Sequence, residues 1–188
     1  MPWECLVGAF YLVWLFHYLG HTNAGVLDQG WSGWLRASGP AEEDSATPTK
    51  GNFTARPLGA LEVSVEELRE IHQYYPVVDG RPANHYSGKE KFPANPSFGR
   101  IPGSLSQPWQ TYLHTDENGL IYMRAPAVPP LLEQNDFPKD TPFLLTCFGG
   151  TGAAVNYVVF YHSGYRNMRL DDAGLRRWNS RNLPLEKD

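Results

Sequence analysis

Hydrophobic residues in this chain gather in short runs separated by polar stretches. The first run spans residues 5–16 (CLVGAFYLVWLF) and predicts a helix over 2–20, which Gly20 ends because glycine accepts the left-handed conformation that follows a helix. A short strand is expected at 25–28 and a short amphipathic helix at 31–36. Residues 41–57 are polar, rich in Pro, Thr and Glu, and lack periodicity, which predicts a linker.

After the linker, predicted helices alternate with short buried strands. Ser64 and Glu67 have the spacing of a capping box, which begins a helix that runs to about Gln73. Residues 84–109 are rich in Gly and Pro and are predicted to be loop. The other predicted elements are strands at 75–79, 143–146 and 168–170, a poor helix at 127–134 and an apolar helix at 153–163. This order indicates an α/β fold in which helices cover a parallel sheet.

Length and charge exclude several classes of protein. The chain has 188 residues, enough for one domain with appendages, and a formal net charge of -4, which gives no electrostatic footprint for nucleic acid. The apolar run near the N-terminus lacks the basic start and cleavage site of a signal peptide. It is also shorter than the roughly 20 apolar residues of a membrane span, so we expect a buried helix and no membrane partner.

The two cysteines, Cys5 and Cys147, make no disulfide framework and favour a reducing compartment, cytoplasmic or mitochondrial.

Cys147 is the candidate nucleophile. It follows the strongest predicted strand and precedes a helix, where open α/β sheets place their ligands. Gly149, Gly150 and Gly152 allow the backbone to curl and turn its N–H groups inward. Those groups and the helix dipole would lower the pKa of the thiol and favour the thiolate. The alternative is that Cys147 is only a small buried hydrophobe at a strand end.

Several motifs in order resemble one family. They are Val-Asp-Gly-Arg at 78–81, Gly-Arg-Ile-Pro-Gly at 99–103 followed by Pro-Trp at 108–109, Thr-Cys-Phe-Gly-Gly-Thr-Gly-Ala at 146–153, and Asp-Asp-Ala-Gly-Leu-Arg-Arg-Trp at 171–178. Together they make residues 62–188 similar to the C-terminal domain of the two-domain rhodanese and mercaptopyruvate sulfurtransferase family. Segments 18–21 and 26–31 resemble the last elements of that family's first domain.

The resemblance implies a rhodanese-like parallel sheet with helices on both faces. It divides the chain into a remnant of a first rhodanese domain at 1–40, a linker at 41–57 and a rhodanese domain with the cysteine loop at 58–188. Apolar side chains of the remnant would then lack their usual partners, and self-association is expected. These side chains are Phe10, Leu12, Trp14, Leu15 and Trp34.

For function, the resemblance implies a sulfurtransferase that needs no cofactor. A small donor, thiosulfate or 3-mercaptopyruvate, would pass sulfane sulfur to a thiol or cyanide acceptor through a persulfide of Cys147. The substrate-binding positions implied are Phe148, Gly149, Gly150, Thr151, Gly152, Ala153, His85 and Lys89.

Departures from the family pattern leave a second function open. Phe148 and Gly149 replace charged or hydroxylic loop residues, and His85 stands where the family has an anion-binding arginine, so weak activity on thiosulfate is expected. The alternative is a catalytically weak or inactive rhodanese module that acts in protein interaction or regulation. Ala153 occupies the position of the arginine that Cys-x5-Arg phosphatases require, which argues against that chemistry. His17 and His21 have zinc-binding spacing but no evident third ligand, so no metal site is expected.

Overall fold

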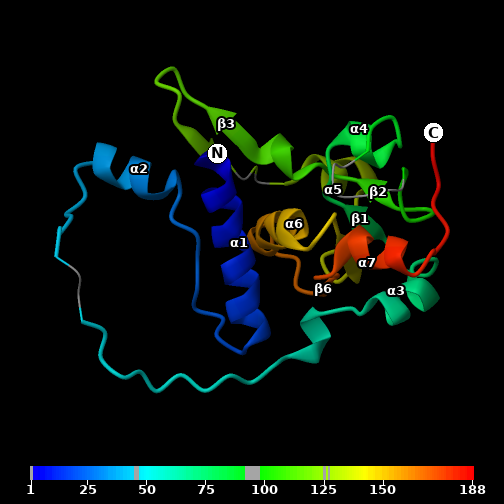
Figure 1. The fold of residues 1–188 in the computed structure, drawn as a ribbon, viewed down its shortest axis with the longest axis horizontal. Helices are drawn as coiled ribbons and strands as arrows, with labels where there is room; N and C mark the ends of the chain where they lie inside the picture. The colour runs from blue at the N-terminus through cyan, green and yellow to red at the C-terminus, as the bar shows by residue number, and fades with distance from the viewer. Residues whose placement is uncertain (1, 45–46, 92–97, 125, 127) are drawn as a thin grey trace.

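Four parallel strands form the centre of the fold (Figure 1). The computed structural model describes residues 2–44, 47–91, 98–124, 126 and 128–188, with side chains described from Leu6 onward. The strands are β1 (Val77–Asp79), β2 (Leu105–Ser106), β5 (Phe143–Thr146) and β6 (Met168–Leu170), in the spatial order β2-β1-β5-β6. All neighbouring pairs are parallel, and the three strands predicted at 75–79, 143–146 and 168–170 are confirmed.

Helices cover both faces of this sheet. They are α1 (Pro2–Tyr18), α2 (Gly30–Arg36), α3 (Val65–Ile71), α4 (Ala83–Tyr86), α5 (Pro130–Asn135), α6 (Thr151–His162) and α7 (Gly174–Ser180), with 3-10 turns η1 (Gly59–Leu61) and η2 (Trp109–Tyr112). Within β5, Phe143 and Leu145 pack in the cluster that includes α6 and α1, whereas Leu144 packs with α3 and α7. Because successive strand residues point to opposite faces, one apolar strand serves both layers. The predicted α/β class with helices on both faces is confirmed.

Other local predictions have mixed outcomes. The helices expected at 2–20 and 31–36 form, but the strand expected at 25–28 is wrong, since that segment carries no strand. The expected loop at 84–109 contains most of α4 and all of β2. The antiparallel hairpin of β3 (Leu113–Thr115) and β4 (Ile121–Met123) was not predicted. Residues 92–97 of that loop lie outside the described residues. The described part of the expected linker at 41–57 carries no helix or strand.

The capping box at α3 is only half formed. The Ser64 hydroxyl oxygen accepts a hydrogen bond from the Glu67 backbone N–H at 3.2 Å, as predicted. The Glu67 carboxylate does not return to Ser64 but accepts two hydrogen bonds from the Arg169 guanidinium, at 2.6 and 2.5 Å. A bidentate partner from β6 competes with the local cap, so α3 is tied to the sheet edge.

The N-terminal helix packs on the rest of the protein. Trp14 of α1 is 2% exposed, lies in the main core cluster and donates a hydrogen bond to the Leu61 carbonyl at 3.3 Å. Phe10 is also buried, against Val155 and Val159 of α6. The expectation that Phe10 and Trp14 lack partners is therefore wrong, because α6 presents an apolar face to α1. The assignment of residues 1–40 to a remnant of another domain stays a prediction.

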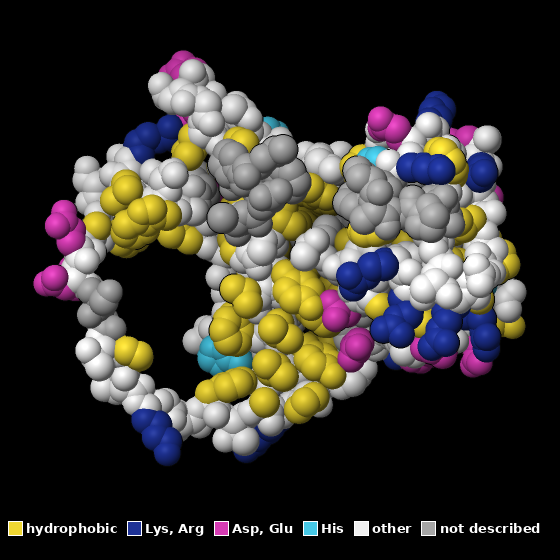
Figure 2. Space-filling model, in the orientation of Figure 1, with side chains coloured by type: hydrophobic (Ala, Val, Ile, Leu, Met, Phe, Trp, Pro, Cys, Tyr) yellow, Lys and Arg dark blue, Asp and Glu magenta, His cyan; other side chains and the backbone are white. Residues whose placement is uncertain are grey.

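Part of the N-terminal region still exposes apolar surface. Figure 2 shows hydrophobic side chains over the lower half of α1 and over α2. Leu12 and Trp34 are exposed, as expected, and Leu15 is half-buried. Self-association through this surface stays a prediction. Within the residues that the structure describes, none of the helices has both the length and the apolar character needed to cross a membrane.

Candidate active site

Cys147 lies directly beyond β5, one of the two central strands, at the start of the turn into α6. Gly150 caps α6 with φ 82° and ψ −39°, a conformation that side chains rarely adopt. A Cβ at this position would lie 2.7 Å from the Asp172 carbonyl oxygen. The turn therefore requires glycine at 150, as the predicted strand–turn–helix arrangement implied.

Backbone N–H groups surround the Cys147 sulfur. Those of Gly149, Gly152 and Ala153 hydrogen-bond to it and favour the thiolate. Burial is the larger effect, because the residue is 4% exposed, and it raises the pKa of the Cys147 thiol above its ordinary value. The charge of nearby Asp79 acts in the same direction. The expected lowering of the thiol pKa is therefore wrong in direction, since desolvation outweighs the N–H groups.

Helix α7 holds the cysteine loop from the other side. The Leu175 N–H donates to the Cys147 carbonyl at 2.8 Å, and the Arg176 N–H donates to the Phe148 carbonyl at 3.1 Å. Gly174 has φ 59°, and a Cβ there would lie 2.6 Å from the Cys147 carbonyl oxygen. Two segments 28 residues apart are thus fastened together by backbone hydrogen bonds, which restricts the loop to one shape.

Asp171 is a buried carboxyl beneath this contact. Its two oxygens accept hydrogen bonds from the Thr146 hydroxyl at 2.9 Å and from the Gly174 N–H at 3.0 Å. Burial raises the pKa of Asp171 to about 6, more than these hydrogen bonds lower it. Asp171 lies in one of the motifs that resemble the family, but the sequence pattern predicted no role for it in the site.

Trp109 is a second residue whose place beside the cysteine loop was not predicted from the sequence. A Cβ added at Gly152 would lie 2.7 Å from Trp109 Cδ1 and 3.5 Å from the Cys147 Cβ. The indole therefore packs against the α6 end of the cysteine loop. Its position depends on the Trp109 N–H, which donates to the Gly80 carbonyl at 3.0 Å at the end of β1.

Asp79 and Arg81 form a buried ion pair. The Arg81 Nη2 lies 2.6 Å from the Asp79 Oδ2, and the same nitrogen donates to the Gly99 carbonyl at 2.9 Å. Arg81 also donates to the His85 carbonyl at 3.3 Å. This pair therefore ties the end of β1 to the neighbouring loops.

The remaining predicted site residues lie in two places. Phe148, Gly149, Gly150, Thr151, Gly152 and Ala153 form the turn and first residues of α6 beside Cys147. His85 lies in α4, with its Nδ1 3.3 Å from the Glu90 carbonyl oxygen, and Lys89 is exposed beyond that helix. Substrate contacts by His85 and Lys89 stay a prediction. Arg100 of the Gly-Arg-Ile-Pro-Gly segment forms ion pairs with Glu186 and Asp188 at 2.7 Å each.

His17 and His21 have the spacing of zinc ligands in the sequence. No group of three His, Cys, Asp or Glu side chains among the described residues is arranged to hold a metal ion. His17 instead lies 3.0 Å through its Nδ1 from the Tyr157 hydroxyl, and His21 is exposed. The side chain of Cys5 lies outside the described residues.

Several known sulfurtransferases are similar to this chain in sequence. No family model matches the chain. The thiosulfate sulfurtransferase of Gallus gallus is 26% identical over 186 residues, which cover 96% of this chain and 63% of that enzyme. The thiosulfate sulfurtransferase of Bos taurus is 25% identical over 95% of this chain and 61% of that enzyme. The chain spans between 58% and 65% of the length of the relatives it matches.

Solved structures give the same fold. The anaerobic ergothioneine biosynthesis enzyme from Chlorobium limicola, in complex with trimethyl histidine, superimposes with a TM-score of 0.80 at 18% identity, over 96% of this chain and 45% of that one. The EanB structure with a cysteine persulfide, in a tetrahedral intermediate state with ergothioneine, superimposes with a TM-score of 0.80 at 19% identity. The match again covers 96% of this chain and 45% of that one. At these identities the likeness shows the fold alone. The sequence relatives match nearly all of this chain's length, so the chain is similar to thiosulfate sulfurtransferases over that length and shares the fold of these solved structures.

Proposed function

We propose that this protein is a sulfurtransferase that carries sulfane sulfur on Cys147. The observation that supports this most directly is the ring of N–H groups from Gly149, Gly152 and Ala153 around the Cys147 sulfur. Such groups stabilise a sulfur anion, whether it is the attacking thiolate or the terminal sulfur of a persulfide. A merely structural buried cysteine needs no such set of donors.

The proposed reaction has two displacement steps. The Cys147 thiolate attacks the outer sulfur of thiosulfate, or the sulfur of 3-mercaptopyruvate. The S–S or C–S bond breaks, and sulfite or the pyruvate enolate leaves with the electron pair. A thiol, as its thiolate, or cyanide then attacks the terminal sulfur of the persulfide, and Cys147 leaves as the thiolate. No external oxidant or reductant is needed. Thiosulfate already carries sulfane sulfur, and with 3-mercaptopyruvate the electron pair of the C–S bond stays on the enolate, which is protonated to pyruvate, so carbon is reduced as sulfur is oxidised.

Intact-mass measurement tests the first step. After treatment with thiosulfate or 3-mercaptopyruvate, we expect the protein to gain the mass of one sulfur atom, and cyanide to remove it as thiocyanate. Cys5→Ser, which leaves only Cys147, should gain the same mass, and Cys147→Ala should gain none. A mass gain that persists in Cys147→Ala would refute the proposal.

The alternative, a weakly active or inactive module for protein contacts, has its own supporting observations. Burial holds the Cys147 thiol in its protonated form, and the nearby Asp79 carboxylate opposes an anion. Phe148 and Gly149 bring no charge to the loop. If the folded protein gains no sulfur from either donor, while Cys147 is alkylated after unfolding, this alternative is the one supported.

A further inference from the structure

A hydrogen bond from the N-terminal helix reaches the segment that leads into α7. The Tyr11 hydroxyl of α1 donates to the Asp172 Oδ1 at 2.6 Å, although the two residues are 161 positions apart in the sequence. Burial and the neighbouring Asp172 carboxylate raise the pKa of Tyr11, so its hydroxyl keeps its proton and remains a donor at neutral pH. Hydrogen bonds to a charged acceptor are among the stronger ones in proteins.

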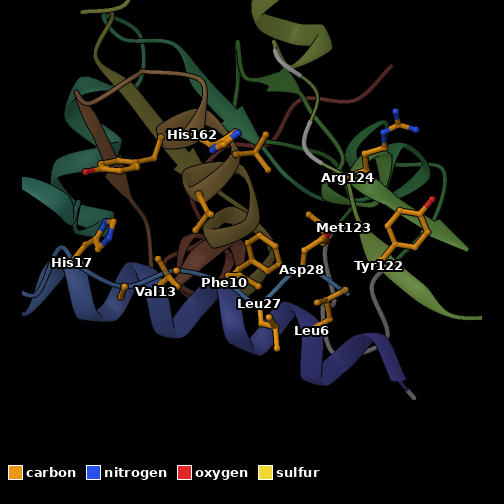
Figure 3. Close-up of a pocket in the computed structure, with 16 residues that line it drawn as sticks. Leu6, Phe10, Val13, His17, Leu27, Asp28, Tyr122, Met123, Arg124 and His162 are labelled. Carbon is orange, nitrogen blue, oxygen red and sulfur yellow. The ribbon is translucent and has the colours of Figure 1, made fainter. Parts of the chain in front are cut away.

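The ring of Tyr11 is held by the core. Figure 3 shows Phe10 and Val13 on the side of α1 that faces a cavity, which α6 also lines. Tyr11, Trp14 and Tyr18 recur three and four residues apart, so they share a second side of the helix. The Tyr11 ring centroid lies 5.4 Å from that of the buried Trp14. This contact restricts the directions in which the Tyr11 hydroxyl can point.

The carboxylate that Tyr11 binds also packs against the cysteine loop. Gly150 ends that loop and caps α6, and a Cβ added there would lie 2.8 Å from the same Asp172 Oδ1. The start of α7, which follows directly, donates two backbone hydrogen bonds to carbonyls of the loop. Tyr11 therefore holds, through Asp172, the segment against which the cysteine loop rests.

In this arrangement the loop covers the candidate nucleophile. Cys147 is 4% exposed, so a reactant can reach its sulfur only after the loop has moved. Local openings of this kind occur at a free energy set by the contacts that they break. A hydrogen bond that fixes the start of α7 therefore opposes the opening of the loop.

We propose that Tyr11 is a positioning residue that acts through Asp172 to keep the cysteine loop closed, and that loss of this hydrogen bond admits reactants to Cys147. The closed loop is independent of the chemistry at Cys147, whereas the entry of a sulfur donor rests on the proposed function. The role of Tyr11 can thus be measured without sulfur transfer.

Three variants isolate the hydrogen bond. Tyr11→Phe removes the hydroxyl and keeps the ring beside Trp14. Asp172→Ala removes the acceptor from the other side. Tyr18→Phe is the matched control, because the Tyr18 hydroxyl also bonds a carboxylate, that of Glu62, which belongs neither to the loop nor to the segment before α7.

Hydrogen exchange followed by NMR measures the opening of the loop. The Leu175 amide, which donates to the Cys147 carbonyl, should exchange faster than the Leu144 amide at the centre of the sheet, as a local opening requires. Tyr11→Phe should speed the exchange at Leu175 by about tenfold, and Tyr18→Phe should leave it unchanged. Equal exchange at the two amides of the parent protein, or equal effects of the two variants, would overturn the proposal.

Alkylation by iodoacetamide measures access to the sulfur. In a Cys5→Ser background, which leaves Cys147 as the only thiol, Tyr11→Phe and Asp172→Ala should each speed alkylation by about tenfold or more. Combining them should give no faster rate than Asp172→Ala alone, because both changes remove the same hydrogen bond. Effects that multiply in the double variant would show that Tyr11 does not act through Asp172.

Sulfur loading separates the role of Tyr11 from the proposed function. With thiosulfate or 3-mercaptopyruvate, Tyr11→Phe should gain the mass of one sulfur atom faster than the parent protein. If alkylation speeds up but no variant gains sulfur from either donor, the proposed function fails and the role of Tyr11 stands. If alkylation of Cys147 in Tyr11→Phe is as slow as in the parent, the role of Tyr11 is refuted, whether or not sulfur is gained.

Discussion

Asp171→Asn tests the electrostatics beneath the cysteine loop. Asp171 is 1% exposed, and its carboxylate accepts hydrogen bonds from Thr146 and Gly174. Asparagine has nearly the same shape. Its oxygen can accept from the Gly174 N–H, while its amide group can donate to the Thr146 hydroxyl. The substitution therefore removes the ionisation of residue 171 and keeps its contacts.

The sign of the pH effect follows from the raised pKa. Burial raises the pKa of Asp171 from its ordinary 3.8 to about 6, so the folded protein binds this proton more tightly than the unfolded chain. The stabilisation that this proton provides is complete below about pH 3.8 and is lost as the pH rises through about 6. At about 1.4 kcal/mol per pKa unit, it amounts to about 3 kcal/mol, of which about 2 kcal/mol is lost between roughly pH 4.5 and 7.5.

Urea unfolding, followed by tryptophan fluorescence, measures this pH-dependent contribution of Asp171 to the free energy of unfolding. We expect the stability of Asp171→Asn relative to the parent protein to rise by about 2 kcal/mol between roughly pH 4.5 and 7.5. Asp136→Asn is the matched control, because Asp136 is exposed and its φ of 48° suits asparagine, so its pH dependence should follow the parent. If Asp171→Asn and the parent change in parallel with pH, the reasoning on Asp171 is refuted.

Four further outcomes are expected. Phe148→Arg combined with Gly149→Lys should raise thiosulfate turnover, measured as thiocyanate formation, because it restores a cation for the anionic donor; an unchanged rate counts against the proposed donor site. Gly174→Ala should lower the free energy of unfolding by roughly 1–3 kcal/mol, since its Cβ would meet the Cys147 carbonyl, and unchanged stability would contradict that contact. Iodoacetamide should alkylate Cys147 far more slowly in the folded protein than in urea, with mass spectrometry of the labelled peptide as readout; equal rates would show an accessible thiolate. Trp14→Ala should destabilise the protein by about 3–5 kcal/mol in urea unfolding, and a change below about 1 kcal/mol would mean that α1 is not part of the core.

Much of the fold and of the candidate site could be predicted from the sequence. The run Phe143-Leu144-Leu145-Thr146 is apolar on both faces, so it was recognised as a buried parallel strand. The glycines after Cys147 indicated a tight turn into a helix, and Gly150 has the positive φ that such a turn requires. The short strands of the hairpin and β2 were missed, because their side chains are mostly half-buried or exposed and do not form the buried apolar run that identified β1 and β5.

The sequence by itself determined the order of the main strands and helices along the chain, the turn at Cys147 and the Ser64 side-chain cap of α3, because these depend on residues close together along the chain. Only the tertiary structure decided the raised pKa of the Cys147 thiol, the pairing of Asp171 with Gly174 and the burial of Trp14. Desolvation depends on every atom that packs around a group, and α1, α6 and α7 bring those atoms from distant parts of the chain. The same loop that sequence reasoning identified as an anion site is therefore one in which a buried thiol keeps its proton more tightly.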